Sequence, residues 1–202
     1  MRAEFPVARW VALAWLGLWA PAYWMTWGPA NFLLFCDVAV ILTCAGIWWR
    51  SSLLLSSQAL TLVFNAAWTL DLAWTAALGK GLFGGTEYMW DAQFPLWVRL
   101  LSFFHVLLPV AQIWALRRTG YDARGWKLQS AVTLGLMMVC TLMRPEKNLN
   151  YIYTEPIFGL SWGPMPVHIL VVWAFIILVI YWPTHCVLKK LLSPRMNTDR
   201  HG

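Results

Sequence analysis

The apolar stretch from Trp97 to Pro109 carries three polar side chains that hydrocarbon disfavours, namely Arg99, Ser102 and His105. Within a membrane, ionisable side chains cost free energy unless they face a protein interior or a wet cavity, so they mark candidate functional sites. A histidine can act there as general base and acid, a serine can act as nucleophile, and an arginine can bind a phosphate or carboxylate. We therefore predict a polar site beside this helix.

Two neighbouring apolar segments place further polar groups at similar depths. A helix rise of about 1.5 Å per residue puts Cys36 and Asp37 about 7–9 Å below the outer end of the second segment. By the same measure Asp71 lies about 10 Å below the outer end of the third segment, and Arg99 and His105 lie about 5 and 15 Å into the fourth. The pattern predicts a polar pocket that opens outward.

The residue types predict thiol chemistry in this pocket. A thiol beside an imidazole can ionise and attack an ester, so Cys36 and His105 are the candidate catalytic pair. Arg99 is expected to form an internal ion pair with Asp37 or Asp71. Structural roles stay open for all of them: a small buried residue for Cys36, an interhelical hydrogen bond for His105, and a salt bridge that only pins helices together.

The composition indicates an integral membrane protein. The 202 residues are 60% hydrophobic and 12% charged, whereas about a quarter of a soluble domain is charged. The formal charge of +6 is expected to follow membrane topology, not nucleic-acid binding. The four cysteines, which are Cys36, Cys44, Cys140 and Cys186, lack the spacing of a metal site, and we expect neither a metal nor a cofactor.

Six segments are long enough to span, because about 20 apolar residues are needed. They are 7–27, 31–49, 53–78, 96–116, 126–143 and 166–188. The predicted fold class is therefore all-α, a polytopic membrane helix bundle with a six-helix transmembrane domain over residues 1–192 and a polar cytoplasmic tail over 193–202. Gly28-Pro29-Ala30 is expected to form a tight hairpin, with Asn31 as the N-cap of the second helix.

The distribution of lysine and arginine predicts the orientation, since cytoplasmic loops carry the excess of positive charge. One side has three in its loops, Lys80, Arg144 and Lys147, besides Arg99. The other side has Arg2, Arg9, Arg50, Arg117, Arg118, Arg124, Lys127, Lys189, Lys190, Arg195 and Arg200. Both termini are therefore predicted to be cytoplasmic, in a bacterial inner (plasma) membrane, with segments 80–95 and 144–165 facing outward.

Several motifs give the chain a family resemblance. They are Asn31-Phe-Leu-Leu-Phe-Cys36, Phe103-Phe-His105, Asn148-Leu-Asn150-Tyr-Ile-Tyr153 and Trp162-Gly-Pro-Met-Pro166. In this order they resemble the YwaF-like six-helix membrane proteins, which are distantly similar to transmembrane phospholipid acyltransferases and androgen-induced fatty-ester hydrolases. The resemblance implies a nucleophile at Cys36 and a catalytic histidine at His105. The chain departs from the family in having Asp37 where a serine is expected.

The leading functional hypothesis is a lipid acyltransferase or ester hydrolase with membrane lipid as its partner. Its predicted substrate-binding residues are Asp37, Asp71, Arg99, Ser102, Asn150 and Tyr151, and segments 148–153 and 162–166 would cover the pocket. The alternative is a noncatalytic membrane subunit or small-molecule binding protein with a membrane protein partner. A proton-coupled transporter would need acidic residues along a route through both leaflets, and the cytoplasmic halves are nearly bare of charge.

Overall fold

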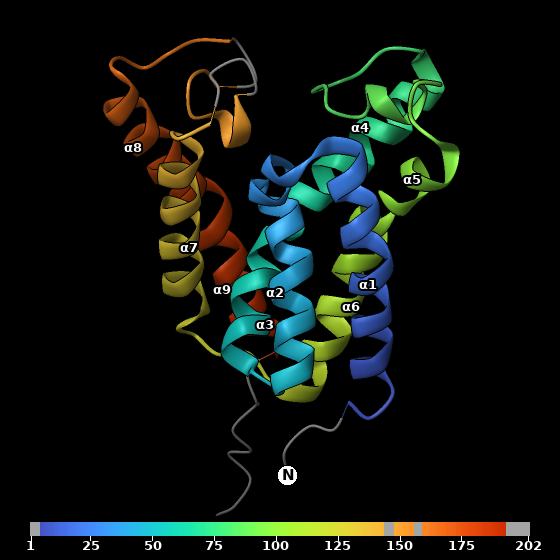
Figure 1. Ribbon diagram of the computed structural model, residues 1–202. Coiled ribbons are helices and arrows are strands. Elements are labelled where there is room, and N and C mark those ends of the chain that lie inside the picture. Colours follow the sequence, from blue (N-terminus) through green and yellow to red (C-terminus); the bar gives the residue numbers. More distant parts are fainter. Residues whose placement is uncertain (1–4, 144–147, 156–158, 193–202) are drawn as a thin grey trace, which may run out of the picture.

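A computed structural model describes residues 5–143, 148–155 and 159–192, and this part of the chain is all-α (Figure 1). Its α-helices are α1 (Ala8–Trp27), α2 (Phe35–Trp49), α3 (Ser52–Gln58), α4 (Leu62–Leu78), α5 (Leu96–Leu101), α6 (Phe104–Thr119), α7 (Gly125–Cys140), α8 (Met165–Phe175) and α9 (Trp182–Leu192). Short turns η1 (Pro29–Leu33), η2 (Ala59–Thr61), η3 (Glu87–Met89) and η5 (Leu149–Tyr151) and a π-helical turn η6 (Ile176–Tyr181) connect or continue them. The predicted tail 193–202 lies outside the described residues.

Three helical segments are long and apolar enough to cross a membrane. They are Ser52–Leu78, Leu96–Thr119 and Met165–Leu192, with 27, 24 and 28 residues. Each contains an irregular turn: η2 in the first, the junction of α5 and α6 at Ser102 and Phe103 in the second, and η6 in the third. These three long apolar helices indicate an integral membrane protein.

The second predicted helix begins later than expected. Gly28, at φ +79°, ends α1, and Pro29 then starts η1, so Asn31 lies inside this turn. Leu34 is extended, and α2 starts at Phe35. The side chain of Asn31 donates to the Asp37 carboxylate at 2.6 Å. The N-cap role predicted for Asn31 is therefore wrong, because its amide holds an aspartate in the next helix.

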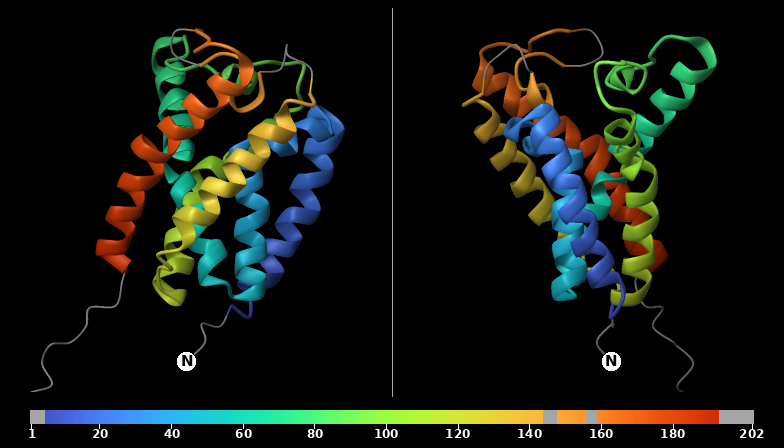
Figure 2. Two further views of the ribbon diagram at one scale, coloured as in Figure 1. Left: turned by 90° about the vertical axis from the view of Figure 1, so that its left-hand side faces the viewer. Right: turned by 45° about the vertical axis from the view of Figure 1, so that its right-hand side comes forward.

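The bundle has a closed base and a forked end (Figures 1 and 2). At the base lie the starts of α1, α3 and α7 and the ends of α2, α6 and α9. At the forked end, η5 and the start of α8 form one lobe with α7, while the end of α4, η3 and α5 form the other. Turn η1 and the start of α2 lie between the two lobes. The fork therefore brings together three parts of the chain that are far apart in sequence.

Two clusters of buried apolar side chains hold the bundle. One joins α3, α6, α7 and the segment Met165–Leu192, and it includes Leu55, Leu116, Met137 and Tyr181. The other joins α1, α2, α5 and α6, and includes Trp19, which contacts both Tyr23 and Phe104. Helices α3 and α6 thus tie the lobe of α7 and α8 to the rest of the bundle.

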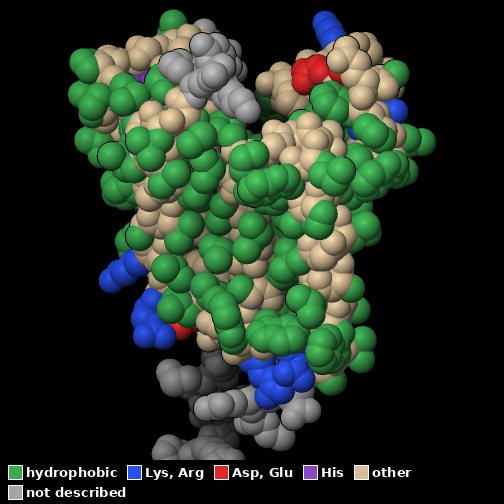
Figure 3. All heavy atoms as spheres, in the orientation of Figure 1, with side chains coloured by type: hydrophobic (Ala, Val, Ile, Leu, Met, Phe, Trp, Pro, Cys, Tyr) green, Lys and Arg blue, Asp and Glu red, His purple; other side chains and the backbone are tan. Residues whose placement is uncertain are grey.

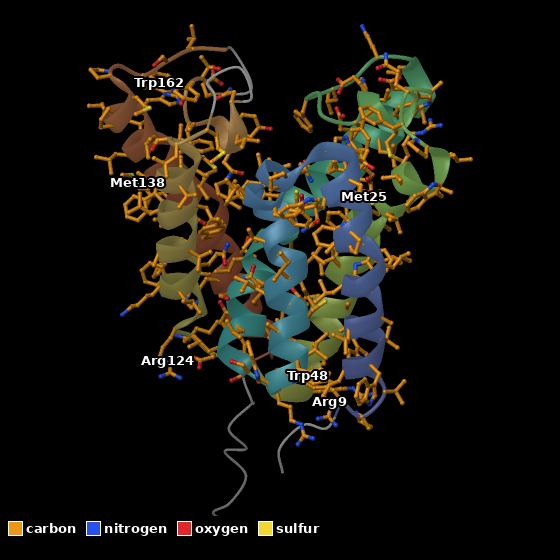
Figure 4. The ribbon with its side chains drawn as sticks, in the orientation of Figure 1. Arg9, Met25, Trp48, Arg124, Met138 and Trp162 are labelled. Carbon is orange, nitrogen blue, oxygen red and sulfur yellow. The ribbon has the colours of Figure 1, made fainter. Side chains whose placement is uncertain are left out.

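Tryptophans and charges mark the two ends of the bundle. Exposed tryptophans occur near the base at Trp10, Trp48 and Trp49, and near the forked end at Trp24, Trp74, Trp97 and Trp162. Figure 3 shows basic side chains gathered mainly at the base, where Figure 4 places Arg9 and Arg124. Apolar side chains cover the surface between the two ends. This distribution is that of a protein surrounded by lipid.

Candidate functional site

Cys36 lies in the first turn of α2, between the two lobes of the fork. It is partly exposed, whereas Cys44 and Cys140 are buried. The phenols of Tyr88, from one lobe, and Tyr151, from the other, both interact electrostatically with its thiol. Tyr151 is 44% exposed, yet protein surrounds its phenol closely enough that burial raises the pKa of that group. Cys36 and these two tyrosines define what we call the fork site.

Asp37, which follows Cys36 in α2, is a buried acidic residue beside the fork site. Its side chain is 1% exposed, and Asn31 is the residue that donates to it. In the described part of the chain, the one ion pair joins Arg124 to Asp122 in the loop before α7. Asp37 therefore has no cationic partner among the described residues. A ligand that donates hydrogen bonds or carries positive charge suits this carboxyl group better than an anion does.

Two phenols enclose the hydroxyl group of Ser102. The hydroxyl groups of Tyr23 and Ser102 are 2.6 Å apart, and Ser102 is fully buried. The phenol of Tyr88 also lies beside Ser102. Burial raises the pKa of the Tyr88 phenol, Ser102 opposes that rise, and the thiol of Cys36 adds to it. Ser102 thus helps to hold Tyr88 over the fork, and its hydroxyl is occupied.

His105 is fixed in position, and it is not bound to Cys36. Its Nδ1 donates to the backbone carbonyl of Ser102 at 2.8 Å. The ring is stacked between Trp68, at 4.2 Å and 12°, and Phe104, at 4.0 Å and 24°. No hydrogen bond joins it to Cys36 among the described residues. The predicted catalytic pair is therefore not hydrogen-bonded in the described structure, and the partners of the His105 ring are Ser102, Trp68 and Phe104.

Asp71 and Arg99 hold the loop between α4 and α5, and they do not pair with each other. The Asp71 carboxylate accepts the backbone N–H groups of residues 82–84 at 2.7, 2.7 and 3.3 Å and the Thr86 hydroxyl group. Arg99 donates to the carbonyl of Met89 at 2.7 Å, and its Nε is buried without an acceptor. The predicted ion pair is not formed in the described structure, because the loop turns back and supplies backbone partners to both groups.

Asn150 has a structural role at the opposite wall of the fork. Its amide accepts the backbone N–H of Phe35 at 3.1 Å and donates to the carbonyl of Leu33 at 2.7 Å. The same amide contacts the sulfur of Cys140 at 3.4 Å. These bonds tie η5 to the start of α2, and Asn150 takes φ +54° to make them. Tyr151, at φ +60°, follows with its ring partly free.

His168 connects the two segments that the sequence predicts as a cover. It is fully buried, its Nδ1 accepts the backbone N–H of Trp162 at 3.1 Å, and its Nε2 donates to the carbonyl of Tyr151 at 3.0 Å. The described parts of both segments are therefore fastened to each other and form a wall of the fork. In the sequence His168 is a single histidine near the start of a predicted helix, and nothing in its spacing indicates that it connects two segments.

A second polar cluster, missed from the sequence, lies in the base half of the bundle. Gln58 donates to Gln129 at 2.9 Å, Gln129 donates to the Tyr181 hydroxyl at 3.4 Å, and Thr133 lies 2.7 Å from that hydroxyl. All four side chains are buried. Single glutamines in apolar segments carry no spacing signal, and only the crossing of α3, α7 and η6 makes them neighbours.

We expect Gln129→Leu to lower the free energy of unfolding by about 2 kcal/mol, since it removes one of the two acceptors of the buried Gln58 amide and a donor to the Tyr181 hydroxyl. Unfolding in detergent would measure the loss. Gln58→Leu combined with Gln129→Leu should restore part of it, because both partners are then apolar. The exposed Gln93→Leu is the control. If the double variant loses the sum of the single effects, the two side chains are not coupled.

Comparisons with known proteins do not assign the site. No protein-family model matches the chain, and neither characterised proteins nor solved structures gave a match. Among the described residues no group of three or more His, Cys, Asp or Glu side chains could hold a metal ion. The arrangement of the fork itself is therefore what indicates a function.

Proposed function

We propose that the chain is a six-span protein of a bacterial inner membrane, with both termini cytoplasmic. The exposed apolar side chains of α1, which include Val11, Leu18 and Met25, support membrane contact for a helix outside the three long segments. The same holds for Met138 and Val139 of α7. Tryptophans at both ends and basic residues at the base support the orientation, because these residues favour the interfaces and the cytoplasmic side respectively.

Within this topology, we propose that the fork site binds a membrane lipid and that the chain acts as a noncatalytic membrane subunit or small-molecule binding protein. One observation carries this proposal. The polar residues expected to do chemistry are bonded to the protein itself, while Cys36 and Tyr151 keep exposed surface between the lobes. Exposed side chains between two lobes, with few other free polar groups around them, are typical of a binding site.

The groups of the fork indicate the kind of headgroup that it accepts. Tyr88 and Tyr151 offer hydroxyl groups, and the buried Asp37 adds a carboxyl group beside them that has no cationic partner in the described structure. Arg99, the cation expected to bind a phosphate, is already bonded to a backbone carbonyl. These groups favour a headgroup with hydroxyl or ammonium donors, such as that of a glycolipid or an aminolipid.

The second candidate function is thiol-dependent acyl transfer or ester hydrolysis, as the resemblance to the YwaF-like proteins implies. It is favoured by the partial exposure of Cys36 between the two lobes. In that reaction the sulfur attacks the ester carbonyl carbon, the alcohol leaves with the thiol proton, and an acyl thioester remains. His105 would have to leave its stack with Trp68 and Phe104 to reach the thiol as a base.

Native mass spectrometry of protein released from lipid nanodiscs would test the binding function. We expect the wild-type protein to retain one lipid noncovalently, and Cys36→Trp to lose it because an indole fills the space between the lobes. Cys36→Ser keeps that space and removes the thiol, so it should retain the lipid. Cys44→Ser, at a buried cysteine away from the fork, is the matched control.

The same experiment separates the two candidate functions. An acyl adduct that hydroxylamine releases from wild-type protein, and that is absent from Cys36→Ser, would favour the thiol enzyme. Equal lipid retention by the wild-type protein and by Cys36→Trp would contradict binding at the fork, provided that both variants elute as folded protein.

A further inference from the structure

His105 also faces a groove that is separate from the fork site. Ala66 and Ala73 of α4 and His105 and Pro109 of α6 line this groove, which has a volume of about 450 Å³ and is open along one side. The other residues that line it are Thr69, Leu70 and Val106, so its surface is almost entirely apolar. The small alanine side chains leave the space, and we call it the α4–α6 groove.

The hydrogen bonds of His105 determine which ring nitrogen carries the proton. A backbone carbonyl can only accept, so the bond from Nδ1 to the Ser102 carbonyl requires that Nδ1 holds the hydrogen. In the neutral ring Nε2 is then an acceptor with a lone pair. Nε2 has no hydrogen-bond partner in the described structure, and protein atoms do not enclose it completely. It therefore keeps an open path to the groove that the ring lines.

The depth of the groove restricts what can occupy it. At about 1.5 Å per residue, His105 lies about 14 Å from Leu96 and about 21 Å from Thr119, at opposite ends of a spanning segment. This is the hydrocarbon region, where an acceptor without a donor costs free energy. Because Trp68 and Phe104 cover both faces of the ring, a ligand can approach only its edge.

We propose that the α4–α6 groove binds an apolar molecule that carries a hydroxyl group, of the alkyl-quinol or long-chain alcohol type, and that this hydroxyl donates to Nε2 of His105. The apolar part lies on Ala66, Ala73 and Pro109. A quinone or ester, which can only accept, cannot make this bond. The site lies in a different groove from the proposed lipid site and does not depend on it.

Nuclear magnetic resonance of ¹⁵N-histidine protein in nanodiscs would test the proposal. A decyl-substituted benzoquinol, the matching benzoquinone and 1-decanol are the probes. We expect the quinol or the alcohol to shift the Nε2 signal of His105 and to leave the Nδ1 signal in place, and whichever probe acts identifies the hydroxyl source. The quinone should bind about fivefold more weakly, since one hydrogen bond is worth about 1 kcal/mol and each tenfold change in affinity about 1.4 kcal/mol.

Two variants test whether the shift arises from His105 and from binding in the α4–α6 groove. His105→Phe assigns the signal and should weaken quinol binding to the level of the quinone. Ala73→Phe fills the groove while His105 and its bond to Ser102 remain, so it should abolish the shift even if His105→Phe does not fold. The proposal fails if neither hydroxyl probe moves Nε2, if quinone and quinol act equally, or if Ala73→Cys gives a disulfide-linked dimer that shows a second copy in the groove.

Discussion

Replacing Gly125 with alanine should lower the free energy of unfolding by about 2–3 kcal/mol. A Cβ atom there would lie 2.8 Å from Cβ of Ser56, 2.9 Å from its carbonyl carbon and 2.9 Å from the backbone nitrogen of Ser57. Two of these three atoms are backbone, so α3 and α7 must move apart, and forced overpacking costs this amount. Chemical or thermal unfolding in detergent micelles would measure it.

Gly135→Ala is the matched control, because Gly135 lies in the same helix and a Cβ there meets nothing within 4 Å. Alanine favours the helix over glycine by about 1 kcal/mol, so this variant should be slightly more stable than the wild type. Equal stability of the Gly125→Ala and Gly135→Ala proteins would mean that α3 and α7 do not cross as closely as described. The crossing matters for the fork, since α7 carries the lobe that contains Tyr151.

Much of the helical layout could be predicted from hydropathy. The predicted segments 7–27, 53–78 and 96–116 correspond to Ala8–Trp27, Ser52–Leu78 and Leu96–Thr119. A long apolar run has few alternatives in lipid, because every backbone group must be bonded within the segment. The breaks inside these segments could not be predicted, since no proline or glycine occurs at η2 or at Ser102 and Phe103. Contacts with neighbouring helices decide them.

The candidate site shows what depth along a helix can and cannot predict. Depth correctly grouped Cys36 and Asp37 towards one end, where the fork lies. It could not show the direction in which each side chain points, because a rotation of 100° per residue separates neighbours on a helix. His105 stacks on Trp68 and lines a groove between α4 and α6, and it forms no hydrogen bond with the thiol that the sequence paired with it in the described structure.

The contacts between loop backbones and polar side chains also could not be predicted from the sequence. Asp71 was a predicted substrate ligand because an isolated charge in an apolar segment is costly, and Asn150 was one because its segment was expected to cover the pocket. Each instead accepts backbone N–H groups from elsewhere in the chain: those of residues 82–84 for Asp71, and that of Phe35 for Asn150. A single sequence does not reveal which backbone group will return to a side chain. Polar residues near a membrane surface can therefore serve the fold of the loops that frame a site.

The clearest test of that role is Asp71→Ala, which should lower the free energy of unfolding by about 3 kcal/mol. The buried carboxylate accepts the backbone N–H groups of residues 82–84 and the Thr86 hydroxyl group, and bonds to a charged acceptor are the stronger ones. Without them the loop after α4 is no longer held to that helix. Amide exchange of residues 82–84 should then accelerate by roughly a hundredfold, since each 1.4 kcal/mol is tenfold.

The consequence should reach the fork site, because the same loop carries Tyr88. Asp71→Ala should therefore weaken lipid retention as well as stability, even though Asp71 need not touch the lipid. Asp91→Ala is the control, since this partly exposed side chain accepts one local N–H from Gln93 and its loss should cost less than about 0.5 kcal/mol. If Asp71→Ala abolished lipid retention while exchange at residues 82–84 stayed slow, the carboxylate would be a direct ligand and its structural assignment would be wrong.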